Sequence, residues 1–175
     1  PALDGDYVAA RSNLASVLVN VTDPYVRAAG ERLRAYALTD LGMFGNSLEA
    51  ARAGLLHLPD TAETRPLRSG LHDAMAYNSI RVGDYETALT HLERTVELDT
   101  LAGRPIDGAV IINNIAGMFA QAGATEESIR LARIHRDVVG AANDPSLQFF
   151  TGMLCARVHF LAGDYTIALH CANEA

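Results

Sequence analysis

The stretch Gly-Asp-Tyr-Glu-Thr-Ala-Leu at residues 83–89 decides the fold, because residues 163–169 repeat it as Gly-Asp-Tyr-Thr-Ile-Ala-Leu. The two copies lie 80 residues apart, and a third glycine, Gly123, lies halfway between them. Gly42 lies 41 residues before Gly83, and Gly5 opens the series. A fixed period of about 40 residues indicates a repeat protein built from one recurring supersecondary unit.

Each period has the composition of two helices. A long apolar-periodic segment, such as residues 109–120, comes first, and the glycine ends it by adopting a left-handed conformation. Asp6, Asp84 and Asp164 are then expected to begin the second helix, where an acid is favoured. Small residues at a fixed phase let successive helices approach closely. They are Ala35, Ala76, Ala116 and Ala156 on the first helices and Ser47, Ala88, Ser128 and Ala168 on the second helices.

Helix-breaking residues close each period, as in Thr22-Asp23-Pro24 and Gly103-Arg104-Pro105. No segment alternates with the period of two that is typical of strands. We therefore expect one all-α domain over residues 1–175. Its expected parts are a partial repeat 1–22, repeats at about 24–60, 65–103 and 106–143, and a truncated repeat 146–175. Because repeats bury their faces against neighbours, the incomplete ends predict that the chain is a piece of a longer protein.

The pattern Gly-Asp-Tyr-x-x-Ala-Leu resembles the tetratricopeptide repeat. Asn114-Ile115-Ala116 with Phe119 and Gly123, and the helix exit Glu97-Leu98-Asp99, are similar to the same family. The resemblance covers nearly the whole chain and implies an α–α superhelix, a right-handed solenoid of helical hairpins. The period departs from the family's usual 34 residues. It is similar to the extended repeats in sensory and regulatory parts of bacterial signalling proteins. The aromatic residue expected early in each first helix is mostly missing, with His72 in one such place.

Composition excludes several functions. The net charge is −7, which argues against a nucleic-acid or anionic-membrane partner. All 14 basic residues are arginine, so the chain has no lysine for a P-loop or a Schiff base. Two cysteines do not make a disulfide framework in a chain of this length, and a reducing, cytoplasmic setting is expected. No cofactor is expected.

The family resemblance implies that a protein or peptide partner lies on the concave face, which the first helices line. Counting back from each glycine places ten candidate binding residues on that face. Arginines there could hold carboxylates, and tyrosines offer flat apolar area, so a peptide with an acidic group and an apolar anchor is expected. The candidates are Arg32, Tyr36, Asp73, Tyr77, Arg81, Asn113, Asn114, Gln121, Met153 and Arg157.

Other interpretations stay open. Each of these side chains also fits ordinary surface or inter-repeat packing. A small molecule enclosed near Tyr36, Tyr77 and Arg81 is one alternative, and self-association through the ends of the stack is another. An enzyme is not expected, because the chain has neither a His-Glu-x-x-His zinc motif nor a Gly-x-Ser-x-Gly nucleophile elbow. No catalytic residue is predicted.

One cluster suggests a metal. Cys155 and His159 are four residues apart, and Cys171 lies as far after Gly163 as Cys155 lies before it. A hairpin at Gly163 would bring both cysteines to a similar height, with His170 nearby, so a zinc site is conceivable. Core packing is favoured instead, because Cys155 falls where the repeat requires a buried apolar residue. No metal is therefore predicted.

Overall fold

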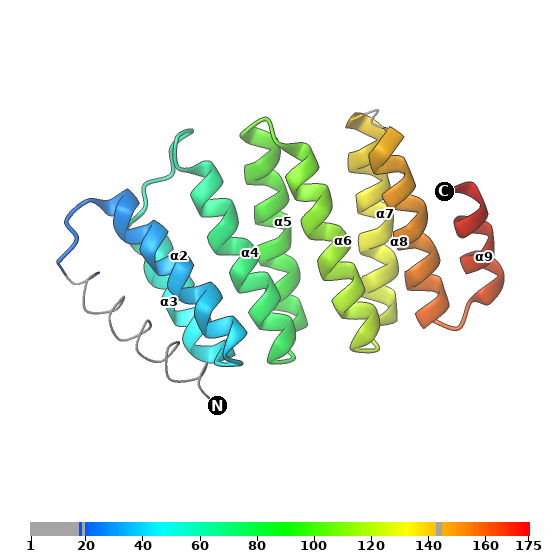
Figure 1. Ribbon diagram of the computed structural model, residues 1–175, viewed down its shortest axis with the longest axis horizontal. Coiled ribbons are helices and arrows are strands. Elements are labelled where there is room, and N and C mark those ends of the chain that lie inside the picture. Colours follow the sequence, from blue (N-terminus) through cyan, green and yellow to red (C-terminus); the bar gives the residue numbers. More distant parts are fainter. Residues whose placement is uncertain (1–17, 19, 143–144) are drawn as a thin grey trace, which may run out of the picture. The chain divides into compact units, whose positions relative to one another are not determined.

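The computed structural model describes residues 18, 20–142 and 145–175, and this part of the chain is all-helical (Figure 1). Gly5, Asp6 and most of the expected partial repeat 1–22 lie outside the described residues. The described helices are α2 (Pro24–Asp40), α3 (Phe44–His57), α4 (Arg65–Arg81), α5 (Tyr85–Leu101), α6 (Pro105–Gln121), α7 (Thr125–Ala142), α8 (Pro145–Leu161) and α9 (Tyr165–Glu174).

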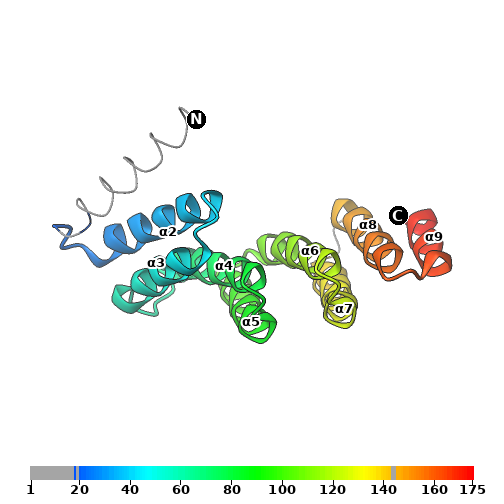
Figure 2. The ribbon, with the colours of Figure 1, turned by 90° about the horizontal axis from the view of Figure 1, so that it is seen from below.

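The chain forms two compact units, residues 1–102 and residues 103–175. Unit 1 contains α2 to α5 and unit 2 contains α6 to α9. Within each unit every helix packs against the next one in sequence, and the first helices of neighbouring hairpins also touch (Figure 2). The predicted all-α arrangement of repeated helical hairpins is confirmed. Among the described residues, no helix combines the length and apolar character needed to cross a bilayer.

Glycine ends the first helix of every hairpin, as predicted. The φ angles of Gly42, Gly83, Gly123 and Gly163 are 72°, 82°, 80° and 86°, in the left-handed region that favours glycine. After each glycine, the next residue donates its backbone N–H to a carbonyl in the last turn of the first helix. The bond from Asp84 N to Ser79 O, for example, is 2.8 Å long. This is a Schellman motif, and it fixes where the chain reverses.

The N-terminal ends of the helices are capped in different ways. Asp84 begins α5, and its carboxylate accepts a hydrogen bond of 3.2 Å from the Thr87 N–H. Asp164 begins α9 without such a bond. Asp23 caps α2 by accepting from Tyr25 N and Val26 N, and Pro24 occupies the first helical position, where no N–H is needed. The residues that break the period therefore also start the next first helix.

The small residues lie where the two helices of a hairpin meet. Ala35 and Ser47 are fully buried, and the Ser47 hydroxyl donates a 2.7 Å hydrogen bond to the Ala35 carbonyl. Ser128 makes the same bond, also 2.7 Å long, to the Ala116 carbonyl in unit 2. A larger side chain at either position would separate the helices, so the periodic alanine and serine set the spacing of the hairpin.

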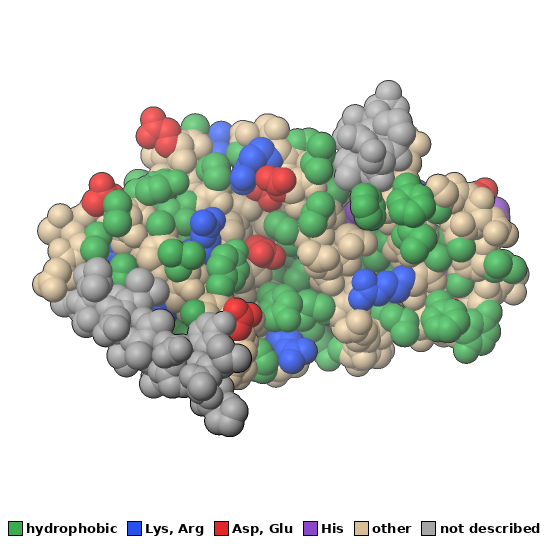
Figure 3. Space-filling view, viewed as in Figure 1, with side chains coloured by type: hydrophobic (Ala, Val, Ile, Leu, Met, Phe, Trp, Pro, Cys, Tyr) green, Lys and Arg blue, Asp and Glu red, His purple; other side chains and the backbone are tan. Residues whose placement is uncertain are grey.

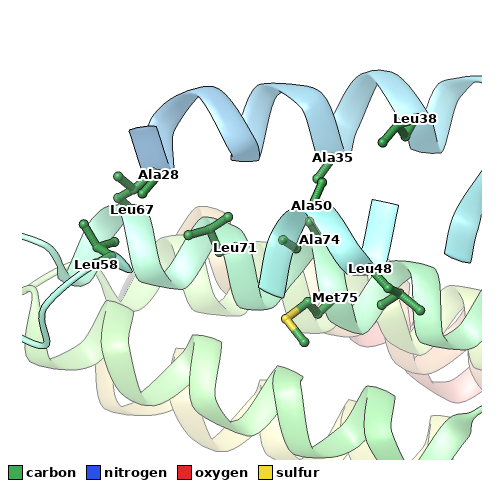
Figure 4. Close-up of a cluster of buried hydrophobic side chains, with 11 residues drawn as sticks. Ala28, Ala35, Leu38, Leu48, Ala50, Leu58, Leu67, Leu71, Ala74 and Met75 are labelled. Carbon is green, nitrogen blue, oxygen red and sulfur yellow. The ribbon is translucent and has the colours of Figure 1, made fainter. Parts of the chain in front are cut away.

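The core of unit 1 is a cluster of small and medium aliphatic side chains from α2, α3 and α4 (Figure 4). Leu71 lies at its centre and is completely buried. Its side chain packs onto Gly54 of α3, where a β-carbon would lie 2.8 Å from a Leu71 methyl group. The missing side chain of Gly54 therefore lets α4 seat against α3.

Candidate functional site

A cavity of about 310 Å³ opens on the face of unit 1 formed by α2 and α4. Three of its lining side chains, Tyr36, Asp73 and Tyr77, were predicted as binding residues from their phase in the repeat. The cavity also lies at the C-terminal end of α2, where the helix dipole is negative. Its lining residues are Tyr36, Thr39, Asp40, Asp73, Ala74, Tyr77 and Asn78.

Two tyrosines form the walls of this cavity. Tyr36 on α2 and Tyr77 on α4 each keep 37% of their surface exposed, so their rings remain available to a ligand. The Tyr36 hydroxyl donates a 3.2 Å hydrogen bond to the Gly70 carbonyl, which fixes the ring between the two helices. Arg32 lies beside it, because a β-carbon on Gly70 would lie 3.0 Å from the Arg32 guanidinium.

Asp73 gives the cavity its electrostatic character. Burial, together with the nearby charge of Asp99, raises the pKa of Asp73 to about 6. Burial also raises the pKa of Tyr36, and the Asp73 carboxylate adds to that increase, whereas the nearby Arg32 guanidinium opposes it. Asp40 adds a second carboxylate to the lining, and no basic residue is among the lining residues. At neutral pH the cavity is therefore a negatively charged pocket.

A buried polar network forms the floor. Asn78 is fully buried, and its amide N–H₂ donates to Thr39 Oγ1 (2.8 Å), Ser47 Oγ (3.0 Å) and the Ala74 carbonyl. The network joins α2, α3 and α4 beneath the cavity, so it rigidifies the walls. Sequence reasoning missed Asn78. The available signal was a polar residue at a phase where other repeats carry Met118 and Val158.

Arg81 does not line this cavity. Its guanidinium lies over the ring of Phe44 on α3, with 5.0 Å between the guanidinium carbon and the ring centroid. This cation–π contact joins the end of α4 to the start of α3. Arg81 is exposed and remains on the surface of unit 1, but the structure gives its charge a partner outside the pocket.

Unit 1 also contains a histidine pair that the sequence did not predict. The Nδ1 atoms of His72 on α4 and His91 on α5 lie 3.0 Å apart, so one ring donates and the other accepts. Burial, together with the nearby His91, Arg68 and Arg94, lowers the pKa of His72 to about 4. Burial lowers the pKa of His91 as well. The pair therefore remains neutral at physiological pH.

The remaining predicted residues lie in unit 2 and do not gather in one place. Asn114 and Gln121 are exposed on α6, and Asn113 is half-buried. Met153 and Arg157, on α8, line an apolar cavity of about 490 Å³ with Phe160, Tyr165 and Leu169. Hydrophobic side chains are prominent over α8 (Figure 3). Arg157 also lies across Gly117 of α6, where a β-carbon would overlap its guanidinium.

Cys155 and Cys171 form a disulfide between α8 and α9. The hairpin at Gly163 brings their Cα atoms to 5.8 Å, within the range that a disulfide spans. The prediction that the two residues lie at a similar height is confirmed, but the prediction that Cys155 only packs in the core is wrong, because it is bonded to Cys171. Both residues are only partly buried. Disulfides are typical of oxidising compartments, in contrast to the reducing setting expected from the cysteine count.

Within the described part of the chain, no three His, Cys, Asp or Glu side chains lie close enough to hold a metal ion. Comparison with protein-family models and with curated proteins finds no match.

Proposed function

We propose that the protein is a partner-binding module, and that the cavity between α2 and α4 of unit 1 receives a basic side chain of a protein or peptide. The observation that carries this proposal is the cavity itself. It combines two carboxylates and two partly exposed tyrosine rings in about 310 Å³, a volume suited to one side chain.

The chemistry of the lining favours a guanidinium or ammonium group. The Asp73 carboxylate is largely removed from water, and an incoming cation would supply the opposite charge that it lacks. The rings of Tyr36 and Tyr77 can contact the same cation through their π faces. The polar floor around Asn78 holds the walls in place, so little ordering is needed on binding.

This proposal changes the charge expected of the partner. The sequence pattern predicts a peptide with an acidic group, because three arginines fall on the first helices. In the structure, Arg81 contacts Phe44. Arg32 lies beside Tyr36 but is not among the lining residues, whereas two aspartates line the cavity. A basic anchor therefore suits unit 1 better than an acidic one.

We further propose that the hairpins are tetratricopeptide-like repeats of long period. The support is the recurring glycine at the same turn, together with the Ser47–Ala35 and Ser128–Ala116 bonds that repeat in two hairpins. A place in a bacterial signalling or regulatory protein follows only from the resemblance of the sequence.

Peptide display on the purified protein tests the binding proposal. Selected peptides are expected to share an arginine or lysine. Their dissociation constants would then be measured by fluorescence anisotropy for the wild type, Asp73→Asn and the matched control Glu86→Gln, which removes an exposed carboxylate on α5. Losing one charge-assisted hydrogen bond should weaken binding by about 10-fold in Asp73→Asn and leave the control unchanged. Peptides without a basic residue, or equal affinity in all three proteins, would contradict the proposal.

A second candidate is self-association through unit 2. The apolar cavity at α8 and α9 is bordered by side chains with large exposed fractions, including Phe160 at 60% and Leu169 at 64%. Exposed apolar surface of this kind is typical of interaction sites. Sedimentation equilibrium of the wild type and of Leu169→Glu should show a dimer only in the wild type. A monomer at all concentrations would remove this candidate.

A further inference from the structure

A second groove, unrelated to the cavity of unit 1, lies among α7, α8 and α9 of unit 2. Its volume is about 510 Å³, and both sulfur-bearing residues of the disulfide line it. A dissolved molecule in this groove therefore lies next to both cysteine residues. The other lining residues are Ile129, Ala132, Arg133, Arg136, Gln148, Thr151, Gly152, His159, Ile167, His170 and Glu174.

The charge in this groove favours an anion. Arg133 and Arg136 are exposed, lie one turn apart on α7 and line the same wall. Glu174 is the acid among the lining residues, and its carboxylate lies 3.4 Å from a ring nitrogen of His170. His159 has its own acid, Asp164, also at 3.4 Å. The Arg136 guanidinium also lies 4.0 Å from the carboxylate of Asp137, but both side chains are largely exposed, so this contact is weak. Arg133 and Arg136 can therefore still hold a ligand carboxylate in bidentate fashion.

Gly152 explains why the disulfide lies on this groove. A β-carbon at Gly152 would overlap Ala175, just after α9, and would lie 3.2 Å from the carbonyl oxygen of Cys171, so the glycine lets the C-terminal part of α9 come this close to α8. Gly152 precedes Cys155 by three residues and therefore lies on the same side of α8. The close approach brings Cys171 against Cys155 at the edge of the groove.

We propose that this groove is a docking site for a small thiol bearing carboxylates, which exchanges with the Cys155–Cys171 disulfide. The thiolate attacks one of the two sulfurs, the Cys155–Cys171 bond breaks, and a mixed disulfide forms as the other cysteine leaves as a thiolate. A second thiol molecule attacks the mixed disulfide and releases the small disulfide. Two thiols are thereby oxidised, and the protein disulfide is reduced to two cysteines.

Exchange at this site changes the attachment of α9. Among the described helices, α9 packs only against α8, and Ala168 is its one buried residue. A helix of ten residues is only marginally stable without contacts to the rest of the protein. The disulfide therefore holds α9 in place, and its reduction should loosen this helix first.

The test compares reduction by three small thiols of different charge, using the oxidised wild-type protein. Thioglycolate is anionic, 2-mercaptoethanol is neutral and cysteamine is cationic. Alkylation and mass spectrometry at timed intervals give the rate constant for each. The ratio of the thioglycolate rate to the 2-mercaptoethanol rate is the readout, because comparing this ratio between variants cancels the intrinsic reactivity of each thiol.

In Arg133→Gln/Arg136→Gln the ratio should fall by about 3- to 10-fold, whereas the control Arg52→Gln, an exposed arginine of unit 1, should leave it unchanged. In Arg133→Glu/Arg136→Glu the preference should shift to cysteamine, and this reversal does not depend on small changes in stability. Hydrogen exchange should show that reduction exposes the amides of α9 before those of α8. An unchanged ratio in both arginine variants, or no disulfide in the oxidised protein, would overturn the proposal.

Discussion

In each unit the neighbouring first helices pack with an arginine of one over a glycine of the other, in opposite order along the chain, and the two units present different surfaces. In unit 1, Arg32 of α2 lies over Gly70 of α4, and in unit 2, Arg157 of α8 lies over Gly117 of α6. Both hairpins that contain a serine at the small-residue position also make the same bond from that serine to the preceding helix. The contacts between helices thus recur in both units, whereas the side chains exposed on the surface differ.

The difference arises at two adjacent phases of the repeat. Six residues before the glycine, unit 1 has two tyrosines, whereas unit 2 has Gly117 and Arg157. Five residues before it, α4 has the buried Asn78, whereas α8 has the buried Val158. A polar floor thus supports a charged cavity in unit 1, and an apolar floor accompanies the apolar surface of α8. The repeat fixes the scaffold, and the residues that do not repeat set the chemistry of each surface.

The greatest loss of stability is expected from a substitution in the core of unit 1. Leu71→Ala should lower the free energy of unfolding by about 3 kcal/mol, because it leaves a cavity at a fully buried position. Hydrogen exchange measured for each unit should show greater loss of protection in α2 to α4 than in unit 2. The matched control is Leu56→Ala, since Leu56 is 80% exposed. Equal destabilisation by both substitutions would contradict the assignment of Leu71 to the core.

A smaller effect is expected from the polar floor that distinguishes the two units. Asn78→Ala should cost about 2 kcal/mol, because Thr39 and Ser47 lose a buried partner. Replacing both partners by apolar residues of similar shape, as in Thr39→Val/Asn78→Leu, should cost less than the single substitution. Chemical denaturation measures both. A double variant less stable than Asn78→Ala would show that the network contributes more than paired hydrogen bonds.

Features that depend on neighbouring residues in the chain were predictable from the sequence, and features that depend on contacts between separate helices were not. The left-handed glycines and the close-packed small residues were predictable, because each depends on one turn or one hairpin. Tyr36, Asp73 and Tyr77 were predicted to share a face, because neighbouring first helices share a phase. Their charge environment was not predictable, since the pKa of Asp73 depends first on its burial in the folded unit and then on Asp99, on a different helix.

Other contacts were not predictable because each side chain has several possible partners in the folded protein. Arg81 could have faced a ligand, but the ring of Phe44, on the preceding helix, takes its guanidinium. Cys155 and Cys171 were predicted at one height, but their bond depends on the close approach that Gly152 permits. His72 meets His91 through the angle between α4 and α5, and a single sequence gives no signal for that angle.

The pH dependence of stability should separate two opposing groups within unit 1. The folded-state pKa of His72 is about 4, below the usual 6.5, so its contribution to stability is complete above pH 6.5 and is lost as the pH falls toward 4. The folded-state pKa of Asp73 is about 6, above the usual 3.8, so its contribution is lost as the pH rises between these values. The two effects partly cancel between pH 4 and 6.

Asp73→Asn should therefore steepen the rise of stability with pH between 4 and 6, and it should add about 1 kcal/mol above pH 6.5. His72→Gln should flatten the same rise. Urea denaturation at half-unit pH intervals measures both slopes. If Asp73→Asn lowers stability at pH 7, the Asp73 carboxylate already has a stabilising partner in the folded protein and is not available to a cationic ligand.

The smallest change in stability is expected at the serine and alanine positions where the two helices of a hairpin meet. Ser128→Ala should cost about 1 kcal/mol or less, because it removes one buried hydrogen bond to the Ala116 carbonyl without leaving a cavity. Ser47→Ala should cost more, since Ser47 also accepts from Asn78. Ala88 and Ala76 are fully buried at the matching positions of the second hairpin. If that hairpin has the same spacing, Ala88→Ser gains the equivalent bond and is neutral or stabilising. Destabilisation by Ala88→Ser would show instead that α4 and α5 lie too close for a hydroxyl, and that the alanine at this phase sets a tighter hairpin than the serine does.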